Sequence, residues 1–230
     1  MITLSNISKA YRTATGWNQV LDNISVTFPS GRSVGILGLN GSGKSTLLRL
    51  IGGVESPDKG EITRDVNVSW PIGFSGGFLP YATGRESTRF ISRIYGAPIK
   101  YIEAFVEEFS ELGEYYDMPY NTYSSGMRAR LAFAISMAME FDCYLVDELT
   151  AVGDQRFRDK YQEAFTQRHS RSTVIMASHQ AHTIQQFCNM SAILYNSRIT
   201  LYESVEEGMT AYNELIRSIK RPTSKDQPSH

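Results

Sequence analysis

The chain has 230 residues, enough for one large domain with a substantial buried core. Lysine and arginine number 23 against 24 aspartates and glutamates, so the net charge of −1 gives no overall basic field to hold nucleic acid. Two cysteines are too few for a disulfide framework. The N-terminus lacks a signal-peptide pattern, and no apolar run approaches the roughly 20 residues that span a bilayer. We therefore expect a cytoplasmic globular protein that does not bind nucleic acid.

Apolar runs predict strands that alternate with helices along much of the chain. The expected strands are residues 2–7, 20–28, 33–37, 143–146 and 173–176, and the expected helices include 44–51 and 205–219. The two later strands are each followed by a helical stretch. This alternation favours an α/β fold with a mostly parallel sheet that is covered on both faces.

The middle of the chain, from about residue 84 to residue 140, contains no convincing strand. Its apolar residues fall at helical spacing between glutamates, namely Ile102, Phe105, Val106, Phe109 and Leu112 with Glu103, Glu107, Glu108 and Glu111. We interpret the acidic face as a solvated helix surface. The predicted organisation is a core of about 1–83 and 141–220, an inserted helical subdomain of about 84–140, and a disordered polar tail over 221–230.

A glycine-rich segment follows the strand expected at 33–37 and opens the helix expected at 44–51. It fits the phosphate-cradling pattern G-x-x-x-x-G-K-[ST]. Glycines let successive backbone N–H groups point at phosphate oxygens, and the helix adds the positive end of its dipole. Lys44 would reach the β- and γ-phosphates, and the Ser45 hydroxyl would ligate Mg²⁺. The predicted phosphate-binding positions are Gly38, Asn40, Gly41, Ser42, Gly43, Lys44, Ser45 and Thr46.

Two acidic residues end the strand expected at 143–146. A buried parallel strand delivers such side chains to the edge of the sheet at which ligands bind. Asp147 would hold Mg²⁺ through its water shell, since this hard ion prefers oxygen ligands. Glu148 is then placed to orient or deprotonate the attacking water. Together with the phosphate loop, this pair predicts nucleotide hydrolysis as well as binding.

The order of motifs over about residues 1–220 resembles the ATPase cassette of ABC transporters. The motifs are the phosphate loop, Tyr123-Ser124-Ser125-Gly126-Met127 before a helix, Leu145-Val146-Asp147-Glu148, Ala151-Val152-Gly153-Asp154, and Ser178-His179. The resemblance implies a P-loop NTPase core with an inserted helical subdomain, and ATP with Mg²⁺ as the bound species. It also implies that a second copy of the chain closes an ATP sandwich.

The resemblance also assigns roles to further residues. The signature residues Ser124, Ser125 and Gly126 would bind the γ-phosphate of ATP held by the opposite subunit, and hydroxyls with N–H groups at a helix N-terminus suit an anion. Asp154 falls in the loop that crosses the dimer interface. His179 falls at the switch position that contacts the γ-phosphate, which makes it a catalytic candidate beside Glu148.

An aromatic side chain is expected to stack on adenine. Tyr11 lies where this family places that ring, and stacking has a clear physical basis. Trp17 is the competing candidate. We favour Tyr11 on its position, and core packing remains the alternative for both rings.

Two departures from the general cassette narrow the resemblance. The usual signature L-S-G-G-Q is replaced by Tyr-Ser-Ser-Gly-Met, and the glutamine usually found in the loop that joins core and helical subdomain has no obvious counterpart. With the segments 70–78 and 83–86, these variants resemble the ATPases of bacterial capsular polysaccharide exporters. The resemblance implies export of a lipid-linked capsular polysaccharide, with work done at the cytoplasmic face of the inner membrane.

The partners implied are a polytopic transmembrane permease, also in two copies, and indirectly the periplasmic and outer-membrane export components. A teichoic acid or O-antigen exporter is the alternative, and a soluble ABC ATPase without a transport role is a more distant one. Trp70, Phe74, Phe78 and Tyr81 precede the helical subdomain, where the family docks a helix of its membrane subunit. We expect these rings either to form that docking surface or to pack the junction between core and subdomain.

Overall fold

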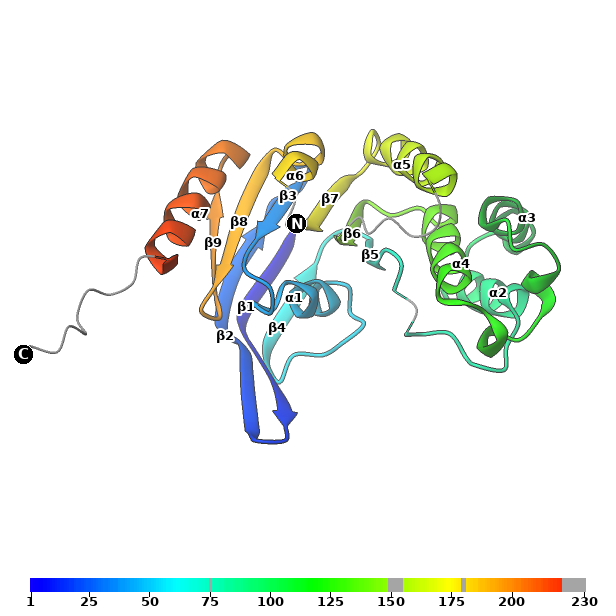
Figure 1. The fold of residues 1–230 in the computed structure, drawn as a ribbon, viewed down its shortest axis with the longest axis horizontal. Coiled ribbons are helices and arrows are strands. Elements are labelled where there is room, and N and C mark those ends of the chain that lie inside the picture. The colour runs from blue at the N-terminus through cyan, green and yellow to red at the C-terminus, as the bar shows by residue number, and fades with distance from the viewer. Residues whose placement is uncertain (75, 149–154, 179–180, 221–230) are drawn as a thin grey trace, which may run out of the picture.

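The computed structural model of the chain describes residues 1–74, 76–148, 155–178 and 181–220. A six-stranded sheet crosses the molecule in the order β5-β6-β7-β3-β8-β9 (Figure 1), and every neighbouring pair is parallel except β8 and β9. Its strands are β3 (Val34–Leu37), β5 (Val68–Pro71), β6 (Cys143–Asp147), β7 (Thr173–Ala177), β8 (Met190–Tyr195) and β9 (Arg198–Tyr202). The predicted α/β fold with a mostly parallel sheet is confirmed.

A second, antiparallel sheet has the order β2-β1-β4. Its strands are β1 (Ile2–Thr13), β2 (Gly16–Phe28) and β4 (Lys59–Arg64). Helix α1 (Lys44–Ile51) buries most of its residues, and Leu47, Leu48 and Leu50 are completely inaccessible. They belong to one buried cluster with side chains of both sheets, so α1 ties the two sheets together.

The remaining helices lie in groups around the six-stranded sheet. They are α2 (Gly84–Ile94), α3 (Ile99–Ser110), α4 (Ser125–Ala138), α5 (Gln155–His169), α6 (Ala181–Phe187) and α7 (Val205–Lys220), with short 3₁₀ turns η1 (Gly113–Asp117) and η2 (Tyr120–Thr122). Figure 1 shows α2, α3 and α4 gathered at one end of the molecule and α7 at the other. No helix in the described part of the chain is both long and apolar enough to cross a membrane.

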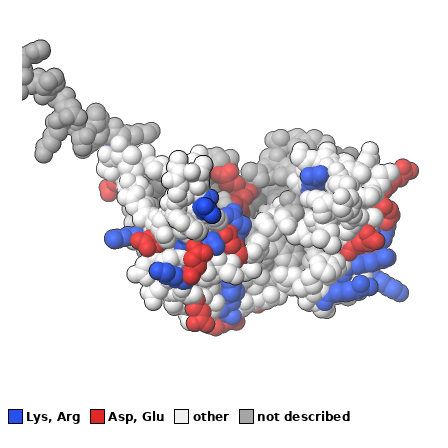
Figure 2. All heavy atoms as spheres, turned by 90° about the horizontal axis from the view of Figure 1, so that it is seen from below, with Lys and Arg blue, Asp and Glu red and all other residues white. Residues whose placement is uncertain are grey.

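Charged side chains of both signs lie next to each other on the face drawn in Figure 2. At the end of the molecule that carries α2 and α3, red and blue atoms form adjacent rows. This face therefore presents no extended surface of a single sign.

The structure differs from the expected elements in two ways. Strand β1 continues to Thr13 and β2 already begins at Gly16, so the two form a long hairpin that the apolar pattern predicted only in part. Strands β4, β5, β8 and β9 were not predicted. Much of the hairpin tip is exposed or half-buried and every residue of β4 except Ile62 is exposed, so pairing with β1 forms these two segments without an apolar signal. Strand β8, in contrast, is almost entirely buried, and its apolar run was missed.

The acidic face of α3 is solvated as expected at Glu107, Glu108 and Glu111, which are exposed, but part of it also forms ion pairs with α2. Glu103 is paired with Arg89 on α2. Glu107 is paired with Arg85, which also lies on α2, with 2.8 Å between its Oε1 and the Nη2 of the arginine. Both arginines lie on α2, and the sequence pattern alone does not show that this face of α2 packs against α3.

Trp70 packs the junction between the sheet and α4. Its ring makes edge contacts with Tyr95 at 5.2 Å and with Phe141 at 5.3 Å between centroids. Its indole N–H donates to the hydroxyl of Ser136 on α4 at 2.9 Å. Tyr81, in contrast, is 84% exposed. Trp70 is therefore a packing residue, which bears out the packing alternative for this ring, and the docking alternative for Tyr81 stays a prediction.

We expect Trp70→Ala to lower the free energy of unfolding by about 3 kcal/mol, because a large ring leaves a packed junction and the structure around it relaxes only in part. Urea denaturation of the isolated chain measures this. Tyr81→Ala is the matched control and should change stability by no more than about 0.5 kcal/mol. Equal unfolding midpoints for the two variants would show that the indole does not hold the junction.

Candidate functional site

The glycine-rich loop joins the central strand β3 to α1. Gly43 precedes the helix with φ of 100°, and a Cβ atom there would lie 2.6 Å from Cγ1 of Val20. Both the left-handed backbone and the close approach therefore require glycine. Gly43 has no side chain that could cap the helix, so the first N–H groups of α1 are left for an anionic ligand.

Lys44 is held inside this loop. Its ammonium donates to the carbonyl oxygens of Gly38 at 2.8 Å and Leu39 at 3.0 Å, and the residue is only 8% exposed. Burial lowers the pKa of Lys44, and the negative charges of Glu148 and Asp147 oppose that shift. The structure thus brings the predicted cation and both predicted carboxylates into one electrostatic environment.

The two carboxylates leave β6 at its carboxyl end. Asp147 pairs with Ala177 of β7, and the N–H of Glu148 donates to the carbonyl oxygen of Ala177 at 2.8 Å. Glu148 has φ of 50°, a conformation that a residue with a Cβ rarely adopts. Strained residues of this kind concentrate at functional sites, and here the backbone turns immediately after the metal-binding candidate.

A cavity of about 180 Å³ opens beside Asp147. Its lining includes Arg49 of α1, Gly73 and Phe74 of the segment after β5, and Phe133 of α4. Gly73 has φ of 80°. The segment that joins β5 to α2 therefore begins at the same edge of the sheet as the predicted metal site.

The donor set at this edge suits Mg²⁺. Ser45 is exposed in the first turn of α1 and offers a hydroxyl oxygen, and Asp147 offers a carboxylate. Oxygen donors with room for retained water are what this ion prefers. The residues present therefore fit the metal that the sequence pattern predicts.

Tyr11 is anchored to the phosphate loop side of the molecule through its hydroxyl. The hydroxyl donates to the carboxylate of Glu55 at 2.8 Å and accepts from a guanidinium nitrogen of Arg49 at 3.1 Å. Thr46, in the first turn of α1, lies 3.4 Å from the same oxygen. Trp17 is 75% exposed in the β1–β2 hairpin. Tyr11, rather than Trp17, is therefore hydrogen-bonded to α1, the helix that follows the phosphate-binding loop.

Glu55 and Arg49 are the site residues that the sequence did not point to. Arg49 stands three residues after Thr46, so helical spacing could have placed it on the same face of α1. Glu55 lies in a loop without any recognisable motif. Hydrogen bonds from Tyr11 and Arg49 lower the pKa of Glu55 against the opposing effect of burial.

The signature segment caps α4. Ser124 is the N-cap, and its hydroxyl accepts from the N–H of Met127 at 3.2 Å. Ser124 and Ser125 are exposed, and a Cβ atom on Gly126 would meet nothing closer than the Ser124 hydroxyl at 4.0 Å. No packing inside the described chain requires glycine at 126, so the space above it is available to a ligand. Asp154 and His179 lie outside the described residues.

The chain belongs to the ABC transporter family, whose sequence profile matches residues 21–151, and it is an ATPase of that class. It is 48% identical to the polysialic acid transport ATP-binding protein of Escherichia coli over 92% of this chain and 96% of that protein. It is 50% identical to the capsule polysaccharide export ATP-binding protein of Neisseria meningitidis serogroup B over 94% of this chain and 100% of that protein. A teichoic acids export ATP-binding protein of Staphylococcus haemolyticus is less similar, at 36% identity over 90% of this chain and 80% of that protein.

The fold is also similar to that of ATP-binding cassettes of known structure. A dimeric ATP-binding cassette in a post-hydrolysis state, bound to ADP and Pi, superposes with a TM-score of 0.70 at 22% identity, covering 89% of this chain and 99% of that one. At this identity the likeness shows the fold alone. The predicted ABC ATPase architecture is confirmed.

Proposed function

We propose that this ATPase drives export of a capsular polysaccharide through a separate transmembrane permease. The two relatives named for polysialic acid and capsule polysaccharide transport support this substrate class, since both align over nearly their full length. The relative named for teichoic acids is less similar, so that alternative has weaker support. The site of action would be the cytoplasmic face of the inner membrane.

The observation that carries the ATPase part of the proposal is the placement of Lys44 and the carboxylates at neighbouring strand ends. Lys44 begins the helix after β3, and Asp147 ends β6 with Glu148 following it, with only β7 between the two strands. Lys44 and the N–H groups of α1 would hold the β- and γ-phosphates of ATP. Ser45 and Asp147 would hold Mg²⁺, which neutralises phosphate charge when bound. Glu148 would orient or deprotonate the attacking water.

The second half of each site would come from another copy of the chain. The N-terminus of α4 offers exposed hydroxyls on Ser124 and Ser125, and the open space over Gly126 allows a phosphate to approach the backbone. We assign Asp154 to the interface loop and His179 to the γ-phosphate contact by resemblance. Tyr11 would stack on adenine, with its hydroxyl fixed by Glu55. In this arrangement residues 84–140 act as the helical subdomain that carries the signature.

The membrane subunit would contact the loop that precedes α2. Leu79 is 65% exposed and Tyr81 is 84% exposed. In the sequence, both follow the segment that lines the Asp147 cavity and precede the start of α2. Phe78 packs against Tyr120 at 5.0 Å between ring centroids, so it supports the loop from within. An exposed apolar pair on a supported loop is a suitable anchor for a partner helix.

Two substitutions separate binding from hydrolysis. Lys44→Ala should lose ATP binding, because the cradle loses its phosphate-facing cation. Glu148→Gln should bind ATP with the parental affinity and lose turnover by at least about 100-fold, since an amide cannot act as a base. Nucleotide titration and phosphate release measure the two effects. A Glu148→Gln protein that hydrolyses ATP at the parental rate would remove Glu148 from the catalytic role.

The docking surface is tested by Tyr81→Ala in the complex with the permease. The soluble subunit should keep its stability and ATP affinity, whereas its affinity for the detergent-solubilised permease should fall by about tenfold, because an anchoring ring is lost. The matched control is Tyr101→Ala, since Tyr101 is also an exposed tyrosine, at 63%, but lies on α3. Equal retention of the permease by both variants would contradict the assignment.

A further inference from the structure

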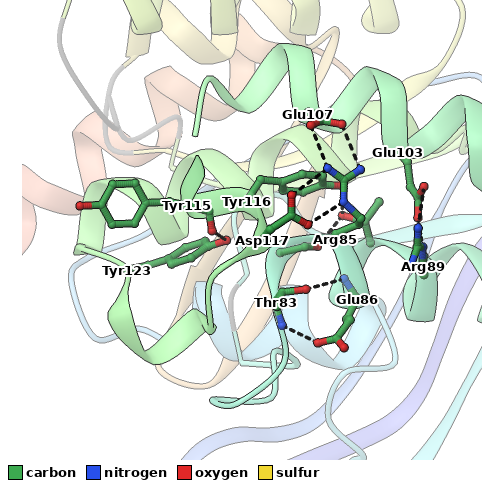
Figure 3. A network of polar contacts seen from close by, with 12 residues as sticks. Thr83, Arg85, Glu86, Arg89, Glu103, Glu107, Tyr115, Tyr116, Asp117 and Tyr123 are labelled. Carbon is green, nitrogen blue, oxygen red and sulfur yellow. Dashed lines mark hydrogen bonds and ion pairs between the residues drawn. The ribbon is translucent and has the colours of Figure 1, made fainter. Parts of the chain in front are cut away.

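The loop just before α2 is hydrogen-bonded to the chain that leads into the signature. Figure 3 shows the side chains around the first turns of α2, with Arg85 between Glu107 and Asp117. The N–H of Tyr120 donates to the carbonyl of Ala82 at 2.9 Å, and that of Asn121 donates to the carbonyl of Pro80 at 2.9 Å. Thr83 then forms a bridge with Pro119. The end of the loop after β5 and the segment just before Ser124 thus run together as a short antiparallel pair.

Arg85, in the first turn of α2, joins α3 and η1 to this helix through Glu107 and Asp117, and we call these three residues the clamp. Its guanidinium donates to both carboxylate oxygens of Glu107 on α3, at 3.0 and 2.8 Å, and to both of Asp117 at the end of η1, at 2.7 and 3.0 Å. The guanidinium also lies 4.7 Å from the centre of the Tyr116 ring. One planar donor fork therefore fixes α2, α3 and η1 relative to one another.

Tyr116 and Tyr123 connect the clamp to the signature, because both pack against the first turn of α2. A Cβ atom on Gly84 would lie 2.6 Å from the hydroxyl of Tyr123 and 2.8 Å from Cδ2 of Tyr116, so glycine allows both rings to pack against the first turn of α2. The Tyr123 hydroxyl also donates to the carbonyl of Tyr115 at 2.5 Å. Tyr123 is buried, and the next residue is the N-cap of α4.

The clamp is better suited to fixing geometry than to adding stability. The side chains of Arg85, Glu107 and Asp117 are 24%, 49% and 60% exposed, and partly exposed ion pairs contribute little net stability. Hydrogen bonds from Arg85 lower the pKa of Asp117, so this carboxylate keeps its charge at neutral pH. A bidentate pair on each side of one guanidinium nevertheless restricts orientation strongly.

We propose that Arg85 is a positioning residue for the signature. By holding η1 and Tyr123 against the first turn of α2, it sets the direction in which Ser124, Ser125 and the N–H groups of α4 face the ATP of the opposite subunit. The inference rests on the proposed function, because it concerns the contact that closes the ATP sandwich. It assigns the role to a residue that lies outside every nucleotide-binding motif of the chain.

The test measures ATP-driven dimerisation in the Glu148→Gln background. Arg85→Ala should raise the dimer dissociation constant at saturating ATP by at least about tenfold, since charged hydrogen bonds that orient the signature are lost. The ATP affinity of the monomer should stay within about twofold, because the cradle lies in the core. Sedimentation velocity and nucleotide titration provide the two readouts.

The matched control is Arg89→Ala. Arg89 stands one turn later on α2 and pairs with Glu103 on α3, so its removal makes the same charge change and breaks an ion pair between the same two helices without touching η1. It should dimerise as the background protein does. A merely structural role for Arg85 would lower the urea midpoint of the monomer and weaken dimerisation together, whereas Arg89→Ala shows the effect of losing one ion pair of α2. A joint loss in Arg85→Ala would overturn the proposal.

Each remaining outcome also decides the question. If Arg85→Ala dimerises like Arg89→Ala, the positioning role is overturned while the sandwich stands. If the Glu148→Gln background itself stays monomeric at saturating ATP, the proposed function fails and the inference fails with it. Should Arg85→Ala not fold, Arg85→Lys replaces it, because an ammonium cannot hold two carboxylates as a bidentate fork does. Parental dimerisation of Arg85→Lys would then contradict the proposal.

Discussion

The site depends on placing the buried ammonium of Lys44 near the two carboxylates at the carboxyl end of β6. Burial disfavours the charge on Lys44, and Glu148 and Asp147 offset that effect. The three groups come from two strands: β3 leads into the helix that carries Lys44, and β6 ends in Asp147, which Glu148 follows. Strand β7 lies between these two and pairs with both, so its register sets how the cradle meets the acidic pair. The parallel sheet thus serves the site by keeping three strand ends aligned.

The signature is positioned by a different set of forces. Apolar packing holds the body of α4, whose residues from Leu131 to Ala138 are all buried, but its N-terminus projects exposed hydroxyls toward solvent. An exposed end that must meet a phosphate needs directional contacts, because hydrophobic burial does not specify direction. The Arg85 fork and the tyrosines beside Gly84 supply contacts of this kind. The same short segment connects them to the loop proposed for the membrane subunit, so one piece of chain serves both surfaces.

Local signals explain what could be predicted. The phosphate loop, α1 and the β6 carboxylates are encoded by glycine placement, a short apolar run and adjacent acidic residues, all within a few positions of each other. Arg85 could not be found in this way, because Glu107 and Asp117 are 22 and 32 residues away on separate elements. Glu55 likewise meets Tyr11 across 44 residues. Strand β4, with Ile62 as its only partly buried residue, depends on its partner β1 and gives no apolar alternation of its own.

The central claim, that each catalytic site combines the cradle of one copy with the signature of another, is tested most directly by mixing two inactive variants. Lys44→Ala disables a cradle, and Gly126→Asp places a carboxylate in the open space that should receive phosphate, where the fold has room for it. Each variant alone should lack ATPase activity. An equimolar mixture should recover about a quarter of the parental rate, because half of the dimers are mixed and one of their two sites is intact. A mixture as inactive as its components would contradict the shared site.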